Sequence, residues 1–262
     1  MLMSLRLDGR RAVVTGGSSG IGEAICIALA AAGARVVVNC SRHIEKAKDV
    51  VQRIQSAGGD AMAIQADISK PASAARMFHK VDAAWGGVDI LINNAGIDGA
   101  RALAWKADID AWRQVIEINL FGAFYCAREA LQRMVPQRKG VILSMSSVHE
   151  EIAWSGYSAY TASKAALGMM TKTLAQEAAP FGIRVLAVAP GAIQTPINAS
   201  VWKNPKKRKD LLAKIPLGRM GIPGDVASMS TFLVSDAASY VTARTIFVDG
   251  GMTDYPDFAH GG

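Results

Sequence analysis

The segment YSAYTASK, residues 157–164, places two tyrosines close to one lysine. Residues four apart lie on the same face of a helix, so this spacing pairs Tyr160 with Lys164 and leaves Tyr157 on another face. A phenol beside an ammonium group suits proton transfer, because the positive charge favours phenolate and lowers the tyrosine pKa from its usual value of about 10. The pair alone does not define an active site, since the same spacing is common between exposed side chains on helices.

The second candidate site is the stretch TGGSSGIG, residues 15–22, which follows a short apolar run. Its glycines, Gly16, Gly20 and Gly22, have the spacing G-x-x-x-G-x-G. Glycines allow a tight turn and a close approach to a pyrophosphate, and the following helix offers free amide groups and the positive end of its dipole. The stretch predicts a dinucleotide-binding loop, although a plain glycine-rich turn has a similar composition.

Both candidate sites must be positioned by an alternating pattern of short apolar runs and helical stretches. The pattern favours helices over residues 22–33, 43–58 and 158–179. The apolar runs, each ending in small or polar residues, predict seven strands, at residues 11–17, 34–39, 61–67, 88–96, 140–147, 183–191 and 245–251. This alternation predicts an α/β protein, a doubly wound Rossmann fold with a mainly parallel seven-stranded sheet and helices on both faces. Ligands bind such sheets beyond the carboxyl ends of the strands, where the candidate residues fall.

Composition favours one folded domain over residues 1–262. Half of the residues are hydrophobic and 19% are charged, which provides ample core material and argues against disorder. The start of the chain, MLMSLRLDGRR, lacks an apolar core, and the longest apolar stretch is interrupted by Gly33 and Arg35, so we expect neither a signal peptide nor a membrane helix. Three widely spaced cysteines favour buried thiols in a cytoplasmic protein.

The chain carries 29 basic and 22 acidic residues, a net charge of +7. Its one dense basic cluster is KNPKKRKD, residues 203–210, without the interleaved aromatic residues of a nucleic-acid site. We therefore expect a small-molecule partner and no nucleic acid. The surplus positive charge would suit an anionic cofactor or substrate, and the basic run is either solvated surface or part of that recognition.

Four separated motifs together resemble the short-chain dehydrogenase/reductase family, from about Arg10 to the end of the chain. They are TGGSSGIG, the NNAG of residues 93–96, a serine thirteen residues before Tyr160, and YTASK. The resemblance implies that Tyr160 transfers the proton, that Lys164 lowers its pKa and holds the nicotinamide ribose, and that Ser147 binds the substrate oxygen. It also implies that Asn119 anchors a water molecule that leads from Lys164 to solvent.

The same resemblance implies a nicotinamide cofactor. We expect no metal ion, because the four histidines, His43, His79, His149 and His260, are scattered and lack the spacing of metal ligands. Asp67 would bind the adenine amino group, and the stretch PGAIQT, residues 190–195, would cover the nicotinamide. Together with the glycine-rich stretch and the residues after the second strand, the predicted cofactor contacts are Gly16, Ser18, Ser19, Gly20, Ile21, Gly22, Ser41, Arg42, Asp67, Ile68, Asn94, Ala95, Gly96, Tyr160, Lys164, Pro190, Gly191, Ile193 and Thr195. The NNAG stretch would serve both as a cofactor contact and as a structural turn.

The residues after the second strand favour NADP over NAD, with NAD tolerated. Many NAD sites place an acidic residue here to bind the ribose 2′-hydroxyl, but this chain has Cys40, and no Asp or Glu occurs before Glu45. Ser41 and Arg42 follow directly and suit a 2′-phosphate. Arg42 at the start of a helix would also be compatible with a solvated surface residue.

Two regions, MSSVHEEIAW and PGAIQTPINA, together with the C-terminal tail resemble the bacterial glucose 1-dehydrogenases. This resemblance implies a sugar hydroxyl as the substrate group, a lid at about residues 193–216, and Ser147, Tyr160, His149, Asn198 and Asp98 as substrate contacts. The lid is more basic than a neutral sugar requires. An alternative is therefore a carbonyl reductase such as a 3-oxoacyl-thioester reductase, and steroids and small ketones are further substrates to consider.

A third alternative is a dinucleotide sensor without turnover, which the presence of Ser147, Tyr160 and Lys164 makes less favourable. The helix at residues 158–179 is rich in Ala, Gly, Met and Leu and is apolar on more than one face, which favours burial on more than one side. Family resemblance implies a homotetramer built partly on this helix and on the last strand. It also implies that the tail MTDYPDFAHGG, residues 252–262, reaches a neighbouring subunit.

Overall fold

The computed structural model describes residues 5–254 and contains one parallel sheet. The strand order is β3-β2-β1-β4-β5-β6-β7, and every neighbouring pair is parallel. The strands are β1 (Arg11–Val14), β2 (Arg35–Cys40), β3 (Asp60–Gln65), β4 (Ile90–Asn93), β5 (Gly140–Met145), β6 (Ile183–Pro190) and β7 (Thr245–Val248). The predicted seven-stranded α/β fold is confirmed.

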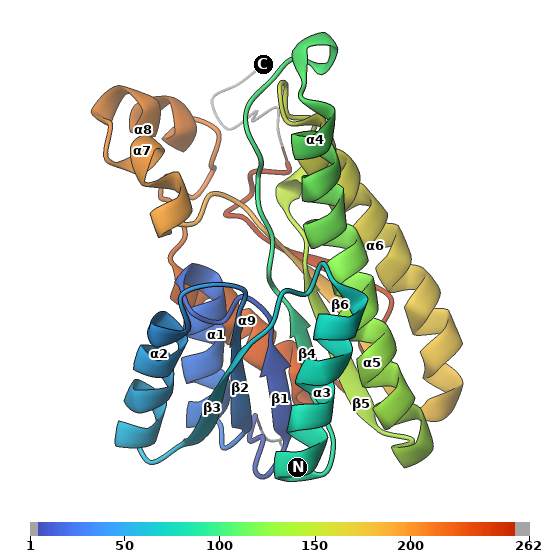
Figure 1. The fold of residues 1–262 in the computed structure, drawn as a ribbon. Helices are drawn as coiled ribbons and strands as arrows, with labels where there is room; N and C mark the ends of the chain where they lie inside the picture. Colours follow the sequence, from blue (N-terminus) through green and yellow to red (C-terminus); the bar gives the residue numbers. More distant parts are fainter. Residues whose placement is uncertain (1–4, 255–262) are drawn as a thin grey trace.

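Helices cover both faces of this sheet (Figure 1). One face packs against α1 (Gly20–Ala31), α2 (Ile44–Ser56) and α9 (Pro223–Val234). The other packs against α3 (Pro71–Trp85), α5 (Gly122–Gln137) and α6 (Ser158–Ala178). Three shorter helices, α4 (Ile109–Ile116), α7 (Ala199–Trp202) and α8 (Pro205–Leu212), lie beyond the carboxyl ends of the strands, and Figure 1 shows α4 beside α6 and α7 with α8 on the opposite side of the molecule.

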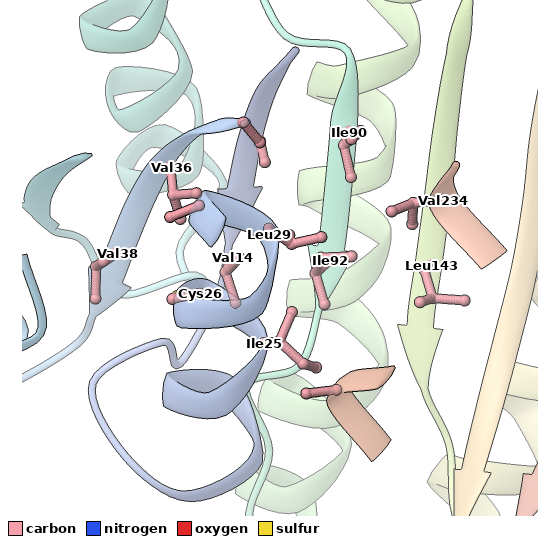
Figure 2. Packing of buried hydrophobic residues seen from close by; sticks show 14 of the residues in the cluster. Val14, Ile25, Cys26, Leu29, Val36, Val38, Ile90, Ile92, Leu143 and Val234 are labelled. Carbon is pink, nitrogen blue, oxygen red and sulfur yellow. The ribbon is translucent and has the colours of Figure 1, made fainter. Parts of the chain in front are cut away.

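The strands are buried on both faces, which explains their nearly continuous apolar sequences. In β1, Val14 packs into the layer of α1, while its neighbour Val13 packs into the layer of α3 and α5. Figure 2 shows the first layer, in which Ile25 and Leu29 of α1 meet Ile92 of β4. Each such side chain is fully buried, and burial of one contributes about 1.5–3 kcal/mol to folding.

The order of the strands fixes where a ligand binds. The chain builds β1, β2 and β3 outward in one direction and then returns to place β4 on the other side of β1. Connections therefore leave β1 and β4 toward opposite faces, which opens a crevice between their carboxyl ends. The glycine-rich stretch follows β1 and the NNAG stretch overlaps the end of β4, so both lie at this crevice.

The three cysteines, Cys26, Cys40 and Cys126, are free thiols and all are buried, as predicted. Burial raises the pKa of Cys26 and of Cys126 well above the ordinary value, which keeps both thiols protonated. Within residues 5–254, none of the helices combines the length and the hydrophobicity needed to cross a membrane.

Candidate active site

Two adjoining cavities of about 650 Å³ and 350 Å³ form one groove along the carboxyl ends of the strands. They share four lining residues, Ile21, Asn94, Gly96 and Thr195, so the groove is continuous from the glycine-rich stretch to Tyr160. Every cofactor contact that the sequence predicted lines one cavity or the other. Among the four predicted catalytic residues only Asn119 lines neither cavity.

The glycine-rich stretch has a backbone that requires glycine. Gly16 and Gly20 adopt φ values of +63° and +58°, which other residues rarely adopt. A Cβ on Gly22 would lie 2.3 Å from the carbonyl oxygen of Gly16, which is too close for any side chain. The first turn of α1 begins here, and the side chain of its N-cap residue, Ser19, forms no capping hydrogen bond. Its amide groups and dipole therefore suit the pyrophosphate of a dinucleotide.

The NNAG stretch holds this loop in place. Thr15 Oγ1 accepts hydrogen bonds from the amides of Asn94 and Ala95 at 3.0 and 3.1 Å. In return, Asn94 Nδ2 donates to the carbonyl oxygens of Thr15 and Gly16 at 2.9 and 3.1 Å. Asn94 also lines both cavities. The geometry is therefore compatible with the prediction that this stretch is a structural turn as well as a cofactor contact.

Two residues that the sequence reasoning missed join Ser41 and Arg42 in the wall of the larger cavity. They are His43, the N-cap residue of α2, and Lys46, in the first turn of that helix. Lys46 lies four residues after Arg42 in the chain and supplies a second cation. This end of the cavity combines two fixed cations with the start of a helix, which suits a phosphate.

Asp67 lies in the same cavity, but half of its carboxylate is already engaged. Its Oδ1 accepts hydrogen bonds from the amide and the hydroxyl of Ser69, at 3.0 and 2.7 Å. Asp67 Oδ2 is therefore the oxygen suited to an adenine amino group. A further residue that the sequence reasoning missed is the buried Asn39, whose Nδ2 bonds the carbonyl oxygens of Ile64 and Ala66 and ties β2 to β3 at the cavity floor.

Ser147, Tyr160 and Lys164 meet at the inner end of the smaller cavity. Ser147 follows β5, and Tyr160 and Lys164 lie in the first two turns of α6. The Ser147 hydroxyl interacts with the Tyr160 phenol and lowers its pKa. Lys164 Nζ lies 5.5 Å from the centre of the Tyr160 ring and donates a 2.7 Å hydrogen bond to the carbonyl oxygen of Met145. A donor, an acid/base and a cation thus surround one point in the groove.

The pKa of Tyr160 is raised in this geometry, to about 12, rather than lowered as the spacing to Lys164 suggested. Burial is the main cause and the Asp98 carboxylate adds to it, whereas Ser147 lowers the pKa. Burial also lowers the pKa of Lys164 to about 8, against the opposing effects of Asp98 and Glu150. The same low-polarity surroundings disfavour both charged forms, and the sequence spacing gave no information about this desolvation.

Asn119 lies in a turn of π-helix at Glu117–Phe121, between α4 and α5. Its Oδ1 accepts from the amide of Ile97 and its Nδ2 donates to the carbonyl oxygen of Ile97, both at 2.9 Å. Nδ2 also donates to Ser163 Oγ, which donates to the carbonyl oxygen of Tyr160. The side chain therefore joins the loop after β4 to α6, and such single π turns are frequent at functional sites.

The predicted substrate contacts Asp98, His149 and Asn198 all line the smaller cavity, but they differ in what they offer. The Asp98 carboxylate has no hydrogen-bond partner within the described part of the chain, and burial raises its pKa. His149 Nδ1 bonds the carbonyl oxygen of Ile152 and so carries the proton, which leaves Nε2 as an acceptor. Asn198 is already engaged: its Oδ1 accepts from Thr195, and its Nδ2 donates to Ile193.

An aromatic stack that the sequence reasoning missed forms one wall of this cavity. Trp154 stacks on His149 with ring centres 4.4 Å apart and on Tyr157 with ring centres 3.9 Å apart. The indole of Trp154 is thus in stacking contact with both rings. The remaining wall residues are mostly apolar: Met145, Val148, Val201, Leu211 and Met252.

Comparison with known proteins gives a family model described as "Enoyl-(Acyl carrier protein) reductase", which matches residues 16–253. The chain is 47% identical to 3beta-hydroxysteroid dehydrogenase 1 of Eggerthella lenta, over 97% of this chain and 98% of that protein. It is 39% identical to glucose 1-dehydrogenase 2 of Bacillus subtilis, over 95% of this chain and 97% of that protein.

Among solved structures, the fold is similar to a gluconate 5-dehydrogenase from Burkholderia cenocepacia in complex with NADP and tartrate. The TM-score is 0.92 at 34% sequence identity, and the similarity covers 97% of this chain and 98% of that one. The family model, which matches residues 16–253, spans most of the glycine-rich stretch, the predicted catalytic residues and the segment of α7 and α8.

The lowered pKa of Lys164 predicts a pH-dependent stability. Unfolded, this lysine titrates near 10.5, but in the folded chain it titrates near 8. Below pH 8 both states bind the proton, and the folded state carries the full cost of the buried charge. Between pH 8 and 10.5 the folded state releases its proton first, so stability rises with pH. Lys164→Met removes this cost. The quantity to compare is the free energy of unfolding of the variant minus that of the parent chain. We expect this difference to be about 2 kcal/mol more favourable at pH 7 than at pH 9.5.

Urea unfolding at the two pH values measures this difference. The matched control is Lys172→Met, which replaces an exposed lysine two turns further along α6 and should give the same difference at both pH values. A Lys164→Met effect that does not change between pH 7 and pH 9.5 would contradict the assignment of a buried, destabilised ammonium group.

Proposed function

Because the chain belongs to the short-chain dehydrogenase/reductase family, we propose that its groove binds a nicotinamide cofactor beside a ring-borne secondary alcohol or the corresponding ketone. Members of this family are oxidoreductases that act on CH–OH donors, and the chain is an oxidoreductase of this kind. The observation that carries the proposal is the convergence of Ser147, Tyr160 and Lys164 at one end of a continuous groove.

Each catalytic side chain has a separate role in this proposal. A bound nicotinamide accepts or supplies the hydride. The Ser147 hydroxyl holds the substrate oxygen beside Tyr160, and the Tyr160 phenol removes the hydroxyl proton during oxidation or returns it during reduction. Lys164, at 5.5 Å from the ring of Tyr160, supplies positive charge beneath the site and hydrogen-bonding capacity toward the cofactor ribose. Asn119 keeps the loop after β4 aligned with α6 through Ile97 and Ser163.

For the substrate, Asp98 favours a polyhydroxylated sugar as the first candidate. Its carboxylate lines the cavity without a hydrogen-bond partner in residues 5–254, and a sugar hydroxyl would supply the missing donor. His149 Nε2 would accept a second hydroxyl. The apolar walls formed by Val148, Val201 and Leu211 favour a second candidate, a hydroxysteroid, whose rings bury more apolar surface than a sugar does.

The basic helix α8 favours the other alternative, an anionic ketone such as a 3-oxoacyl thioester. Residues 203–214 carry six cations and one carboxylate, and Lys206, Lys207, Arg208 and Lys209 are exposed. None of these four forms an ion pair within the described part of the chain. Leu211 of the same helix lines the cavity, so we propose that residues 193–216 cover the substrate and that their charge faces its entrance.

A panel of substrates tests the reaction and separates these candidates. D-glucose and a 3β-hydroxysteroid would be oxidised with NADP⁺, and acetoacetyl thioester would be reduced with NADPH, with nicotinamide absorbance as the signal. We expect turnover of a ring alcohol, which Tyr160→Phe reduces about 10²–10⁴-fold because the proton-transfer group is lost. Tyr157→Phe removes a neighbouring hydroxyl from outside both cavities and should leave kcat within about twofold.

The outcomes are distinguishable. Turnover of the thioester alone, weakened by added salt, would assign a role to α8 and reject both ring alcohols. Turnover that survives Tyr160→Phe would reject the catalytic assignment itself. Nicotinamide binding without turnover of any carbonyl or alcohol would favour the sensor without turnover.

For the cofactor, we propose that NADP is preferred and NAD tolerated. Arg42, Ser41 and Lys46 supply two cations and a hydroxyl at the end of the cavity where an adenosine 2′-phosphate would lie. Arg42→Ala should weaken NADP binding about 10–100-fold, the loss of one or two charge-assisted hydrogen bonds, and should change NAD binding less than about twofold.

Titration of both nucleotides by intrinsic fluorescence would measure this ratio. Lys48→Ala is the matched control, because Lys48 is an exposed cation on α2, the helix that follows Arg42, and does not line the cavity. An Arg42→Ala loss that is equal for NADP and NAD would contradict the proposed preference.

For assembly, we propose a homotetramer with two contact regions on this chain. Large apolar side chains are exposed on α5 and α6 and beside them, among them Phe121, Phe124 and Met169. A second set, Phe232 and Tyr240, is exposed near α9 and the edge strand β7. Such faces are typical of protein interfaces. The predicted tail contact lies mostly outside the described residues, since only residues 252–254 of that tail are described.

Sedimentation equilibrium at micromolar concentration would test the assembly. We expect a mass about four times that of the 27.7 kDa chain, because both exposed faces would otherwise remain in water. Phe124→Glu should produce a smaller species. A monomer for the parent chain would reject the tetramer.

A further inference from the structure

The carboxylate of Glu150 lies behind the catalytic residues and lines neither cavity. Glu150 ends the 3₁₀ turn at Val148–Glu150, directly after Ser147. Its Oε2 accepts a short hydrogen bond of 2.6 Å from Ser146 Oγ, and its Oε1 accepts one of 3.0 Å from Thr245 Oγ1. One side chain therefore joins the end of β5 to the first residue of β7.

Helix α6 approaches this carboxylate closely because it has a glycine at the point of contact. A Cβ on Gly168 would lie 2.2 Å from Glu150 Oε1, well inside van der Waals contact. Gly168 follows Lys164 by four residues and so lies on the same face of α6, one turn further on. The absence of a side chain at residue 168 thus makes room for Glu150 against the helix that carries Tyr160 and Lys164.

Ser146 transmits this contact to the reacting groups. Its amide donates to the carbonyl oxygen of Val188 at 2.7 Å, and its hydroxyl lies 3.4 Å from the carbonyl oxygen of Lys164. Ser147 is the next residue, so the position of its hydroxyl follows from how Ser146 is held. Glu150 Oε2 is the closest partner of the Ser146 hydroxyl and determines its orientation.

The charge of Glu150 also acts on Lys164. The groups that face the Lys164 ammonium are Tyr160 from the same helix, Asp98 from the loop after β4, and Glu150. Asp98 borders the cavity, whereas Glu150 is held away from it by Ser146 and Thr245. Its contribution is therefore independent of what occupies the groove.

We propose that Glu150 is a positioning residue for the proposed hydride-transfer reaction: its carboxylate fixes Ser146, and through it Ser147, against α6 and ties β7 to the active site. This inference rests on the proposed function. Glu150 touches neither substrate nor cofactor and acts through Ser146 and Lys164. The glycine at residue 168 and the threonine at residue 245 are the two partners that this arrangement requires.

The central experiment compares Glu150→Gln with Glu151→Gln. Both remove one carboxylate from the same turn, but Glu151 is exposed, so it serves as a matched control. We expect Glu150→Gln to lower kcat about tenfold, because the amide removes the negative charge and replaces one acceptor oxygen by a donor, and to leave the KM for the nicotinamide cofactor within about twofold. Glu151→Gln should match the parent enzyme.

The pH profile of kcat separates positioning from loss of structure. The Glu150 carboxylate raises the pKa of Lys164, so its removal lowers that pKa and moves the corresponding limb of the profile to lower pH. Thr245→Val removes one hydrogen bond and no charge. It should lower kcat by a smaller factor and leave the limb in place.

Gly168→Ala tests the contact with α6 independently. In the parent chain the new methyl group displaces the carboxylate and should lower kcat about as much as Glu150→Gln does. In the Glu150→Ala background the methyl group has no carboxylate to displace and should have little further effect, so the two substitutions should be strongly non-additive. This double-mutant cycle also tests the positioning role of Glu150 if the Glu150→Gln variant fails to fold.

Two failures can be told apart. If the parent enzyme turns over its substrate but Glu150→Gln and Glu151→Gln share its kcat and pH profile, the positioning role is overturned and the proposed function stands. Additive effects of Gly168→Ala and Glu150→Ala would overturn it equally. If the parent chain binds nicotinamide nucleotide but turns over no alcohol or carbonyl, the proposed function fails, and this inference fails with it.

Discussion

The burial of one ammonium group governs this active site. Lys164 lies in the second turn of α6 with almost none of its surface exposed, and within residues 5–254 its Nζ has one hydrogen bond, to the carbonyl oxygen of Met145. Burial of a charge with so few partners is costly, and the cost lowers the pKa of Lys164 to about 8. Two carboxylates, Asp98 and Glu150, offset part of this cost from different sides. The surrounding elements must therefore be held in fixed positions, since a small displacement would leave the cation unpaired.

The parallel sheet supplies that rigidity. Because all seven strands run in one direction, their carboxyl ends meet along a single edge, and residues far apart in the chain converge there. Thr15 after β1 and Asn94 after β4 bond each other directly, and Ser146 after β5 bonds the backbone of Val188 in β6. Each loop is thus fixed by its neighbour as well as by its own strand. The reacting groups share this fixed edge, whereas the aromatic stack and α8 lie further from it.

Much of the fold was predictable from the sequence, because continuous apolar runs and glycine-containing turns mark buried parallel strands. The residues that line the groove were also predictable, since fixed motifs at strand ends can lie only at one edge. The pKa of Tyr160 was not: spacing places a cation near the phenol but says nothing of the desolvation that raises the pKa. The stacking of Trp154 between His149 and Tyr157 was equally hidden, because it depends on how an irregular loop folds back. Asn198 was predicted as a substrate contact, but its side-chain oxygen and nitrogen form hydrogen bonds with the backbone of Thr195 and Ile193.

The hydrogen bonds of Asn198 also connect the two cavities through Thr195. Thr195 lines both cavities, and it is tied to the segment before α8 from two directions. Asn198 Oδ1 accepts from the Thr195 amide, and Trp202 Nε1 donates to the Thr195 carbonyl oxygen at 3.0 Å. The short helices α7 and α8 are therefore anchored at a residue that also borders the region proposed for the cofactor. A displacement of Thr195 would therefore move the segment that is proposed to cover the substrate, because the same hydrogen bonds hold both.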